Sequence, residues 1–274
     1  MLNNLHKLAQ LGQSPWYDNM ERGLIENGEL EKIFTQGILG VTTNPSIFEK
    51  AINNSKSYDK DIATLKEAGK APLEIYDDLT LHDVALAADL LLKTYERTSG
   101  VDGYVSLEVL PEYAHDAQKT IENARRLFSI LKRKNIMIKI PSTKEGCMAI
   151  KELISEGINI NATLIFSLSQ YEAVANAYID GINDGVKKGK DLSKVHSVAS
   201  IFVSRLDSKV DSELQKILSN GKDADIKNVI KNLLGKTAVA NIKIIYSRYK
   251  ELFSNKKINP QRVLWASTST KNPE

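Results

Sequence analysis

Three side chains of this sequence carry a chemistry that their surroundings favour: Lys139, Glu108 and Asp18. Lys139 lies within the apolar run Ile136–Pro141, where an amine loses part of the solvation that favours its ammonium form. A neutral amine can attack a carbonyl and form a Schiff base, whose iminium group lets a neighbouring C–C bond break or form. The cycle also needs proton carriers, and Glu108 and Asp18 can divide that work, with Thr163 helping to hold a water.

Each of these residues also has a purely structural interpretation. A lysine at a strand end is most often a solvated cation, Glu108 can be a surface carboxylate, and Asp18 can be a helix N-cap. Arg205 can pair with an aspartate on the helix that follows it. No single residue therefore decides the function, and the argument for chemistry depends on how many such groups converge.

These residues are far apart in the sequence, so secondary-structure elements must bring them together. Short apolar runs of strand length indicate such elements. Seven runs occur: Trp16–Asp18, Ile38–Asn44, Gly103–Leu110, Ile136–Pro141, Ile158–Phe166, Ser197–Val203 and Arg262–Ser267. Amphipathic stretches of helical period separate them: Leu81–Thr98, Ala114–Lys134, Thr143–Glu156, Gln170–Lys188 and Val229–Phe253. This alternation is typical of parallel strands with crossover helices.

The sequence favours a (β/α)8 barrel of the TIM type, with seven strands present in this chain. A doubly wound open sheet normally carries a glycine-rich phosphate loop, and neither GxGxxG nor GxxxxGK[ST] occurs here. A barrel needs no such loop and commonly takes about 250 residues. Because no linker, low-complexity tract or repeat divides the chain, we expect a single domain over residues 1–274.

Period-two alternation places polar side chains on the inward face of these strands. If Ile136, Ile138 and Ile140 pack under helices, Lys139 points into the barrel. The same argument turns a further set of side chains inward, namely Tyr104, Ser106, Glu108, Asn161, Thr163, Ser200 and Phe202. Asp18, Asn44 and Ser267 end their own runs. Every strand thus offers a polar group near its C-terminal end, where barrels build active sites.

Composition excludes several other classes. The 37 Lys and Arg against 34 Asp and Glu give a net charge of +3, without the basic stripe that nucleic acid needs. Four scattered histidines have no zinc spacing, and the single Cys147 cannot form an internal disulfide. No apolar run is long enough for a signal peptide or a membrane span. We therefore expect a cytoplasmic protein with no zinc site and with no nucleic acid or membrane partner.

Three segments resemble the transaldolase family. They are Gly40–Phe48 (GVTTNPSIF), Ile136–Gly146 (IMIKIPSTKEG) and Glu156–Ser167 (EGININATLIFS), and the likeness extends over nearly the whole chain. The spacing is similar to that of the longer, single-polypeptide branch. The resemblance implies a transferase of the pentose phosphate pathway that needs no metal and no organic cofactor. It moves a dihydroxyacetone unit from sedoheptulose 7-phosphate to glyceraldehyde 3-phosphate, giving erythrose 4-phosphate and fructose 6-phosphate.

The resemblance also implies a role for each matched residue. Lys139 is the Schiff-base lysine, Asp18 the base that acts on the substrate hydroxyl, and Glu108 an acid/base working through a water held with Thr163. The remaining matches are substrate-binding: Asn44 and Asn161 to the dihydroxyacetone part, Ser200 and Ser267 to the substrate, and Arg205 to the phosphate. Lys271 is the candidate for a second phosphate ligand.

Two alternatives to a transaldolase stay open. The related fructose 6-phosphate aldolases share the lysine but have glutamine in place of Glu108 and tyrosine in place of Phe202, so both positions favour transfer. In the family an eighth strand and terminal helices follow the segment that ends here at Glu274. We therefore expect a C-terminally incomplete barrel, and a weakly active sugar-phosphate-binding fragment is the second alternative. A homo-oligomer is neither favoured nor excluded.

Overall fold

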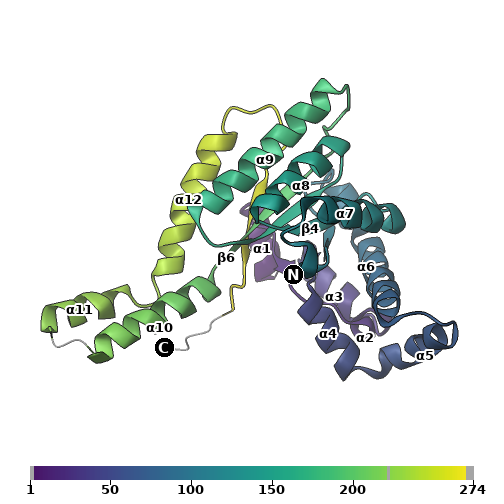
Figure 1. The fold of residues 1–274 in the computed structure, drawn as a ribbon, viewed down its shortest axis with the longest axis horizontal. Helices are drawn as coiled ribbons and strands as arrows, with labels where there is room; N and C mark the ends of the chain where they lie inside the picture. Colours follow the sequence, from purple (N-terminus) through teal and green to yellow (C-terminus); the bar gives the residue numbers. More distant parts are fainter. Residues whose placement is uncertain (1–2, 221–222, 270–274) are drawn as a thin grey trace. The chain divides into compact units, whose positions relative to one another are not determined.

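The computed structural model describes residues 3–220 and 223–269, which contain seven strands and the helices that join them (Figure 1). All seven predicted strands are present at the expected places. The chain divides into two compact units, Met1–Lys139 and Ile140–Glu274. The expectation of a single domain over residues 1–274 stays a prediction.

The first unit is built on four parallel strands in chain order. They are β1 (Trp16–Tyr17), β2 (Gly40–Thr42), β3 (Tyr104–Glu108) and β4 (Ile136–Pro141), the last of which continues past Lys139 into the second unit. The α-helices of this unit are α1 (Asn4–Gln10), α2 (Arg22–Glu26), α3 (Glu29–Thr35), α4 (Pro45–Asn54), α5 (Asp59–Glu67), α6 (Pro72–Arg97) and α7 (Ala117–Leu131). Two short 3-10 helices, η1 (Lys56–Tyr58) and η2 (Pro111–Tyr113), complete it.

The second unit continues the same pattern with three further parallel strands. They are β5 (Ile160–Ile165), β6 (Ser197–Phe202) and β7 (Arg262–Ala266), paired in that order. The helices are α8 (Lys144–Glu156), α9 (Leu168–Lys187), α10 (Ser204–Asn220), α11 (Ala224–Leu233) and α12 (Thr237–Phe253). The strand–helix alternation is that expected of the α/β class.

Several crossover helices begin at a polar side chain that accepts a backbone N–H of the first turn. Asn44 caps α4, Asp116 caps α7, Thr143 caps α8 and Ser167 caps α9. Such caps satisfy donors that a helix leaves unpaired at its start. These capping residues therefore fix where the four helices begin.

One predicted helix is divided in the structure. The stretch Val229–Phe253 reads as a single amphipathic helix, but α11 ends at Leu233 and α12 begins at Thr237. Gly235 between them has φ +68°, which a glycine adopts without steric cost. Its N–H donates to the Asp211 carboxylate of α10 at 3.1 Å, and this contact stabilises the turn.

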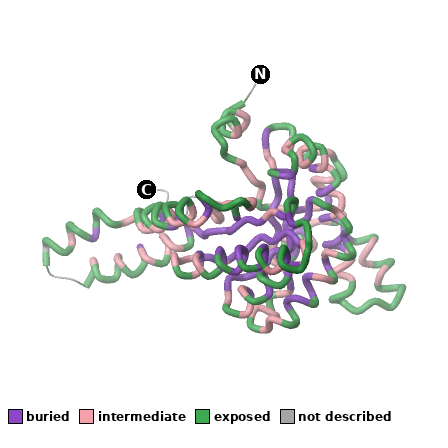
Figure 2. Tube along the Cα trace, turned by 90° about the horizontal axis from the view of Figure 1, so that it is seen from above, coloured by how far each residue is buried: buried purple, intermediate pink, exposed green. Residues whose placement is uncertain are grey.

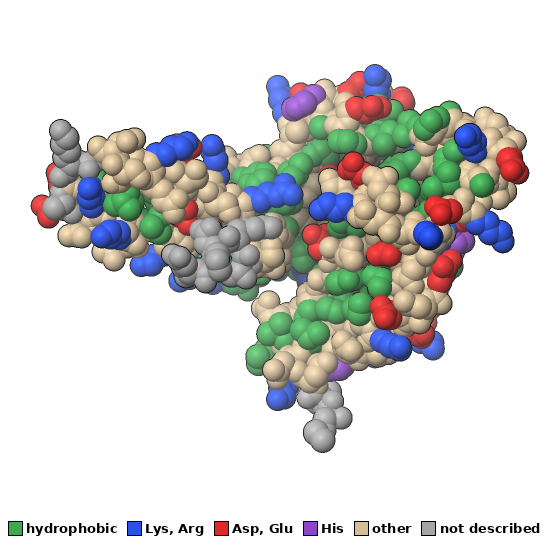
Figure 3. All heavy atoms as spheres, turned by 90° about the horizontal axis from the view of Figure 1, so that it is seen from below, with side chains coloured by type: hydrophobic (Ala, Val, Ile, Leu, Met, Phe, Trp, Pro, Cys, Tyr) green, Lys and Arg blue, Asp and Glu red, His purple; other side chains and the backbone are tan. Residues whose placement is uncertain are grey.

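The core lies along β2, β3 and β4 in the first unit and along β5 and β6 in the second, and these buried strands are purple in Figure 2. Val41, Tyr104 and Val105 are fully buried in the first unit, and Ile160, Ala162 and Ile201 in the second (relative exposure 0% each). In Figure 3 both lysine or arginine and carboxylate side chains are scattered over the face shown. Within the part of the chain that the structure describes, no helix is long and apolar enough to cross a membrane.

Candidate active site

Lys139 and Glu108 contact each other at the ends of neighbouring strands. They are register partners in the parallel pairing of β3 with β4, so their side chains lie on the same face. Lys139 Nζ lies 3.1 Å from Glu108 Oε2, and the two side chains are only 7% and 14% exposed. A strand parity argument put both groups on one face, and the structure confirms it. Glu108 can thus exchange a proton with the amine without an intermediary.

A second acceptor fixes the Lys139 amine. Lys139 Nζ donates to the backbone carbonyl of Thr43 at 3.1 Å. Thr43 is itself held, because its N–H and its hydroxyl both donate to the carbonyl of Ser106, at 3.2 and 2.7 Å. Thr43 and Ser106 are completely buried. The amine is therefore oriented by two oxygens on strands or strand ends that cannot easily move.

Asp18 lies directly after β1 and is oriented from β2. Thr42 Oγ1 donates to Asp18 Oδ1 at 2.6 Å, a charge-assisted hydrogen bond. Trp16, two residues earlier, covers Gly40, because a Cβ at that glycine would lie 2.5 Å from the indole ring. The glycine lets β1 and β2 approach closely enough for Thr42 to reach Asp18. The carboxylate itself is exposed and can meet a solute.

Asn44 has a structural role in addition to its candidate role in substrate binding. Its side-chain oxygen accepts the N–H of Ile47 at 3.0 Å, and Pro45 occupies the first turn of α4. Asn44 is therefore the N-cap of α4. The hydrogen bond uses only the amide oxygen, and the amide nitrogen remains a donor that a ligand hydroxyl can use.

Tyr76 of α6 is a group near this site that the sequence did not indicate. Burial, together with the charges of Asp77 and Glu108, raises the pKa of Tyr76 to about 12. Its phenol therefore keeps its proton at neutral pH. Its ring packs edge-on against Phe48 of α4, with centroids 6.4 Å apart.

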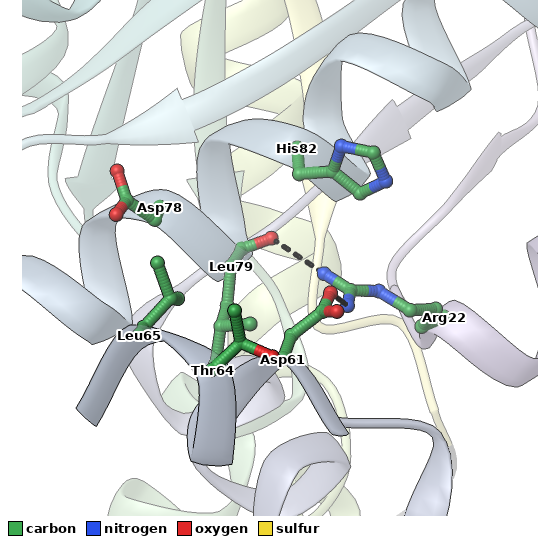
Figure 4. A pocket seen from close by; sticks show the side chains of 7 residues that line it. All are labelled: Arg22, Asp61, Thr64, Leu65, Asp78, Leu79 and His82. Atoms are coloured by element: carbon green, nitrogen blue, oxygen red, sulfur yellow. Dashed lines mark hydrogen bonds and ion pairs between the residues drawn. The ribbon is translucent and has the colours of Figure 1, made fainter. Parts of the chain in front are cut away.

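The segment after Asp18 is anchored by a buried arginine. Arg22, at the start of α2, is 2% exposed, and its Nε donates to Asp83 Oδ1 at 2.8 Å. Its other nitrogens reach the Asp61 carboxylate and the Leu79 carbonyl, as Figure 4 shows around a cavity of about 210 Å³. Tyr58 donates to the second oxygen of Asp83 at 2.8 Å. The network ties α2 to α5 and α6, four residues beyond Asp18.

In the second unit, Asn161 and Ser200 form a buried pair. Ser200 Oγ donates to Asn161 Oδ1 at 2.7 Å, and the residues are 2% and 0% exposed. They come from β6 and β5, which are hydrogen-bonded neighbours. The expected inward direction of both side chains agrees with this contact.

Thr163 is the one expected residue whose hydroxyl is orphaned. It is fully buried, and its Oγ1 has no hydrogen-bond partner among residues 3–220 and 223–269. Its strand is irregular, since the pairing with β6 shifts register between Ala162 and Ile165, and Leu164 has φ +60°. The regular alternation expected for this strand is therefore wrong at Leu164, where a bulge interrupts it. A buried unpaired hydroxyl indicates a water or ligand position.

Arg205 is the second residue of α10, directly after Ser204, which contacts Ser267. Ser204 donates its N–H to the Ser267 carbonyl at 2.9 Å, and the two hydroxyls are 3.0 Å apart. Arg205 does not pair with the aspartates of its own helix: Asp207 accepts the N–H of Ala238 and Asp211 that of Gly235. Across the described ranges, no carboxylate lies within ion-pair distance of Arg205. The exposed guanidinium is thus available to an anion.

The structure thus groups the expected residues within each unit. Two pairs of expected residues are in direct contact, Lys139 with Glu108 and Asn161 with Ser200. Two further expected residues contact a neighbour that was not expected: Asp18 contacts Thr42, and Ser267 contacts Ser204. Lys271 lies outside the described residues. Thr42 and Thr43 were not singled out as functional, although the motif Gly40–Phe48 contains both. Within the described part of the chain, no cluster of His, Cys, Asp and Glu suits a metal ion.

These features define an α/β protein of the TIM-barrel type with a lysine and carboxylates at its strand ends. The family model of transaldolase/fructose-6-phosphate aldolase matches residues 15–274. The chain belongs to the transaldolase/fructose-6-phosphate aldolase family.

Relatives within that family carry a more specific name. A transaldolase from Trichodesmium erythraeum is 45% identical over 280 residues, which cover 99% of this chain and 74% of that protein. Transaldolase 2 from Nostoc sp. is 44% identical, with 99% and 74% covered, and the transaldolase from Thermobifida fusca is 42% identical, with 98% and 74% covered. The chain therefore spans about three quarters of the length of these relatives.

Proposed function

We propose that this protein is a transaldolase. It transfers a dihydroxyacetone unit between phosphorylated sugars, from sedoheptulose 7-phosphate to glyceraldehyde 3-phosphate, through a Schiff base on Lys139. The observation that carries the proposal is the buried Lys139–Glu108 contact, because it provides a nucleophilic amine with an adjacent proton acceptor. The transaldolase relatives support the same conclusion.

In the proposed cycle, the Lys139 amine attacks the ketone carbon of the donor sugar. Glu108 takes the ammonium proton beforehand and returns a proton to the carbinolamine hydroxyl, which leaves as water. Asp18 then removes the proton of the hydroxyl on the β carbon, and the Cα–Cβ electron pair moves into the iminium. The aldehyde product leaves, and an enamine of dihydroxyacetone stays on the lysine. An acceptor aldehyde reverses these steps, so atoms and protons balance without a cofactor.

Residues around these groups have proposed roles in binding. Thr42 orients Asp18, and the Asn44 amide nitrogen donates to a substrate hydroxyl. In the second unit, Asn161 and Ser200 contact substrate hydroxyls, and the orphaned Thr163 hydroxyl holds a water. Arg205 binds the phosphate, with Ser267 beside it, and Lys271 is retained as the candidate for a second phosphate ligand.

The structure favours transfer over lysis at two positions. Glu108 is a carboxylate rather than a glutamine, and Phe202 provides no phenolic proton donor that would quench the enamine. The enamine should therefore persist until an aldehyde arrives. A cytoplasmic location stays a prediction.

The test compares two rates in the same preparation. With fructose 6-phosphate and erythrose 4-phosphate together, sedoheptulose 7-phosphate should form much faster than dihydroxyacetone forms from fructose 6-phosphate alone. Lys139→Ala should abolish both reactions, while Lys134→Ala, an exposed lysine paired with Glu96, should leave them unchanged. Equal rates with and without acceptor would indicate an aldolase. No rate in either assay from a folded chain would indicate a sugar-phosphate-binding fragment instead.

A further inference from the structure

The guanidinium of Arg205 lies over the ring of Phe202 in the second unit. The guanidinium carbon is 5.0 Å from the ring centroid, within the range of a cation–π interaction. Phe202 ends β6 and is 8% exposed, whereas Arg205 follows three residues later and is exposed. The buried Phe202 ring thus lies beneath the long, flexible side chain of Arg205.

The Phe202 ring is itself held in place. It packs against the ring of Phe166 at the end of β5, with centroids 5.1 Å apart and an interplanar angle of 38°. The backbone of Phe166 is tied on both sides: its N–H donates to Gln170 Oε1 at 2.9 Å, and its carbonyl accepts Asn241 Nδ2 at 3.0 Å. Side chains of α9 and α12 therefore hold the backbone of Phe166, whose ring packs against the Phe202 ring under Arg205.

We propose that Phe202 is a positioning residue for phosphate: its ring orients the Arg205 guanidinium so that the N–H edge faces the phosphate of the sugar. This rests on the proposed function. A flexible arginine loses side-chain entropy when it binds an anion, and a platform that restricts it beforehand lowers that cost. Within the described residues no carboxylate does this work, so the ring is the contact that remains. The aromatic character of Phe202, rather than its volume alone, should then determine phosphate affinity.

The experiment measures the dissociation constant of inorganic phosphate by ³¹P NMR titration, which needs no turnover. Phe202→Leu keeps an apolar side chain but removes the π face, and should weaken binding about two- to fivefold. Phe202→Tyr keeps the π face and should bind phosphate as the unmodified protein does. Phe253→Leu is the matched control, because Phe253 contacts the Tyr178 and Tyr249 rings in the same unit and, among the described residues, no cation.

A double-mutant comparison separates the effect of the Phe202 ring on Arg205, here called the platform effect, from an effect of Phe202 on packing. Arg205→Ala should weaken phosphate binding about ten- to a hundredfold, as expected for a charge-assisted contact. In that background, Phe202→Leu should cause no further loss. With fructose 6-phosphate as substrate, Phe202→Leu should raise KM and leave kcat little changed. If Phe202→Leu does not fold, Phe202→Met serves the same purpose.

The outcomes distinguish this inference from the proposed function. If Arg205→Ala weakens binding but Phe202→Leu and Phe202→Met do not, the platform is wrong and the phosphate role of Arg205 stands. Further loss in the double variant would also overturn the platform, because Phe202 would then act independently of Arg205. If Arg205→Ala binds phosphate normally, both the platform and the phosphate role fail, although Schiff-base chemistry at Lys139 is unaffected.

Discussion

Lys139 Nζ and Glu108 Oε2 lie 3.1 Å apart, at matched positions of two neighbouring parallel strands. An ion pair that is removed from water needs compensation, and here a third group, the Thr43 carbonyl, shares the lysine protons. The arrangement keeps a proton donor and a proton acceptor in contact before any substrate binds. This contact carries our account of the reaction.

Glu108→Gln tests the carboxylate of this pair. The amide fills the same space but cannot take up a proton, so kcat should fall about 10²- to 10⁴-fold, the usual range for general acid–base catalysis. The control is Glu112→Gln, an exposed carboxylate just beyond the same strand. A kcat of Glu108→Gln equal to that of the control, measured by transfer to erythrose 4-phosphate, would assign Glu108 a structural role only.

Thr42→Val tests the orientation of Asp18. Valine keeps the shape of threonine but cannot donate the 2.6 Å hydrogen bond. Hydrogen bonds to charged groups contribute about 1.5–3 kcal/mol, so kcat/KM should fall about ten- to a hundredfold. Thr42→Ser keeps the hydroxyl and should retain most of the activity. Equal losses in the two variants would mean that packing, not the hydrogen bond, is what Thr42 provides.

The buried Arg22–Asp83 pair should behave as a unit. Asp83→Leu leaves the Arg22 charge without its buried partner and should lower the free energy of unfolding by about 3–5 kcal/mol. In the unmodified protein, burial raises the pKa of Tyr58 well above its usual value, so this phenol keeps its proton and donates it to Asp83. The double variant Arg22→Met/Asp83→Leu should be more stable than Asp83→Leu alone in urea denaturation. Additive losses would show that the two charges do not interact.

The surface ion pair of Arg133 with Asp89 should make the free energy of unfolding depend on pH. Arg133 donates to both oxygens of Asp89 at 2.8 Å, and these hydrogen bonds lower the pKa of Asp89. Since the folded pKa lies below the unfolded one, the stabilisation is present above the unfolded value and is lost as the pH falls through the folded value. The pair is partly exposed, so the contribution should be about 0.2–1 kcal/mol.

The matching measurement is urea denaturation of Asp89→Asn beside the unmodified protein. The variant should be less stable at pH 7, and the difference should be smaller at a pH below the ordinary aspartate pKa of about 3.9, because Asp89 takes up its proton below that value. A difference that is the same at both pH values would show that the charge of Asp89 is not its cause.

Strand positions and side-chain directions could be predicted from the sequence because burial on both faces leaves a strong pattern. Alternation in Ile136–Pro141 and Gly103–Leu110 placed Lys139 and Glu108 on one face, as the structure confirms. The pattern fails where the backbone departs from regular geometry. Neither the bulge at Leu164 nor the turn at Gly235 has a signal in hydrophobic period.

Contacts that support the site could not be predicted in the same way. Thr43 binds Lys139 through its backbone carbonyl, which every residue has, and Thr42 reaches Asp18 across 24 positions of sequence. Phe202 was expected to point inward, which its burial supports, but its contact with the Arg205 guanidinium depends on the arginine rotamer. Contacts of this kind depend on the three-dimensional arrangement of the chain, for which hydrophobic period carries no signal.

Covalent trapping at Lys139 tests the central claim most directly. The protein is treated with fructose 6-phosphate and sodium borohydride, digested, and the modified peptide identified by mass spectrometry. The account predicts a reduced dihydroxyacetone adduct on Lys139 within the peptide containing Ile136–Pro141, and no adduct in Lys139→Ala. An adduct on another lysine that persists in Lys139→Ala, or no adduct on a folded protein, would contradict it.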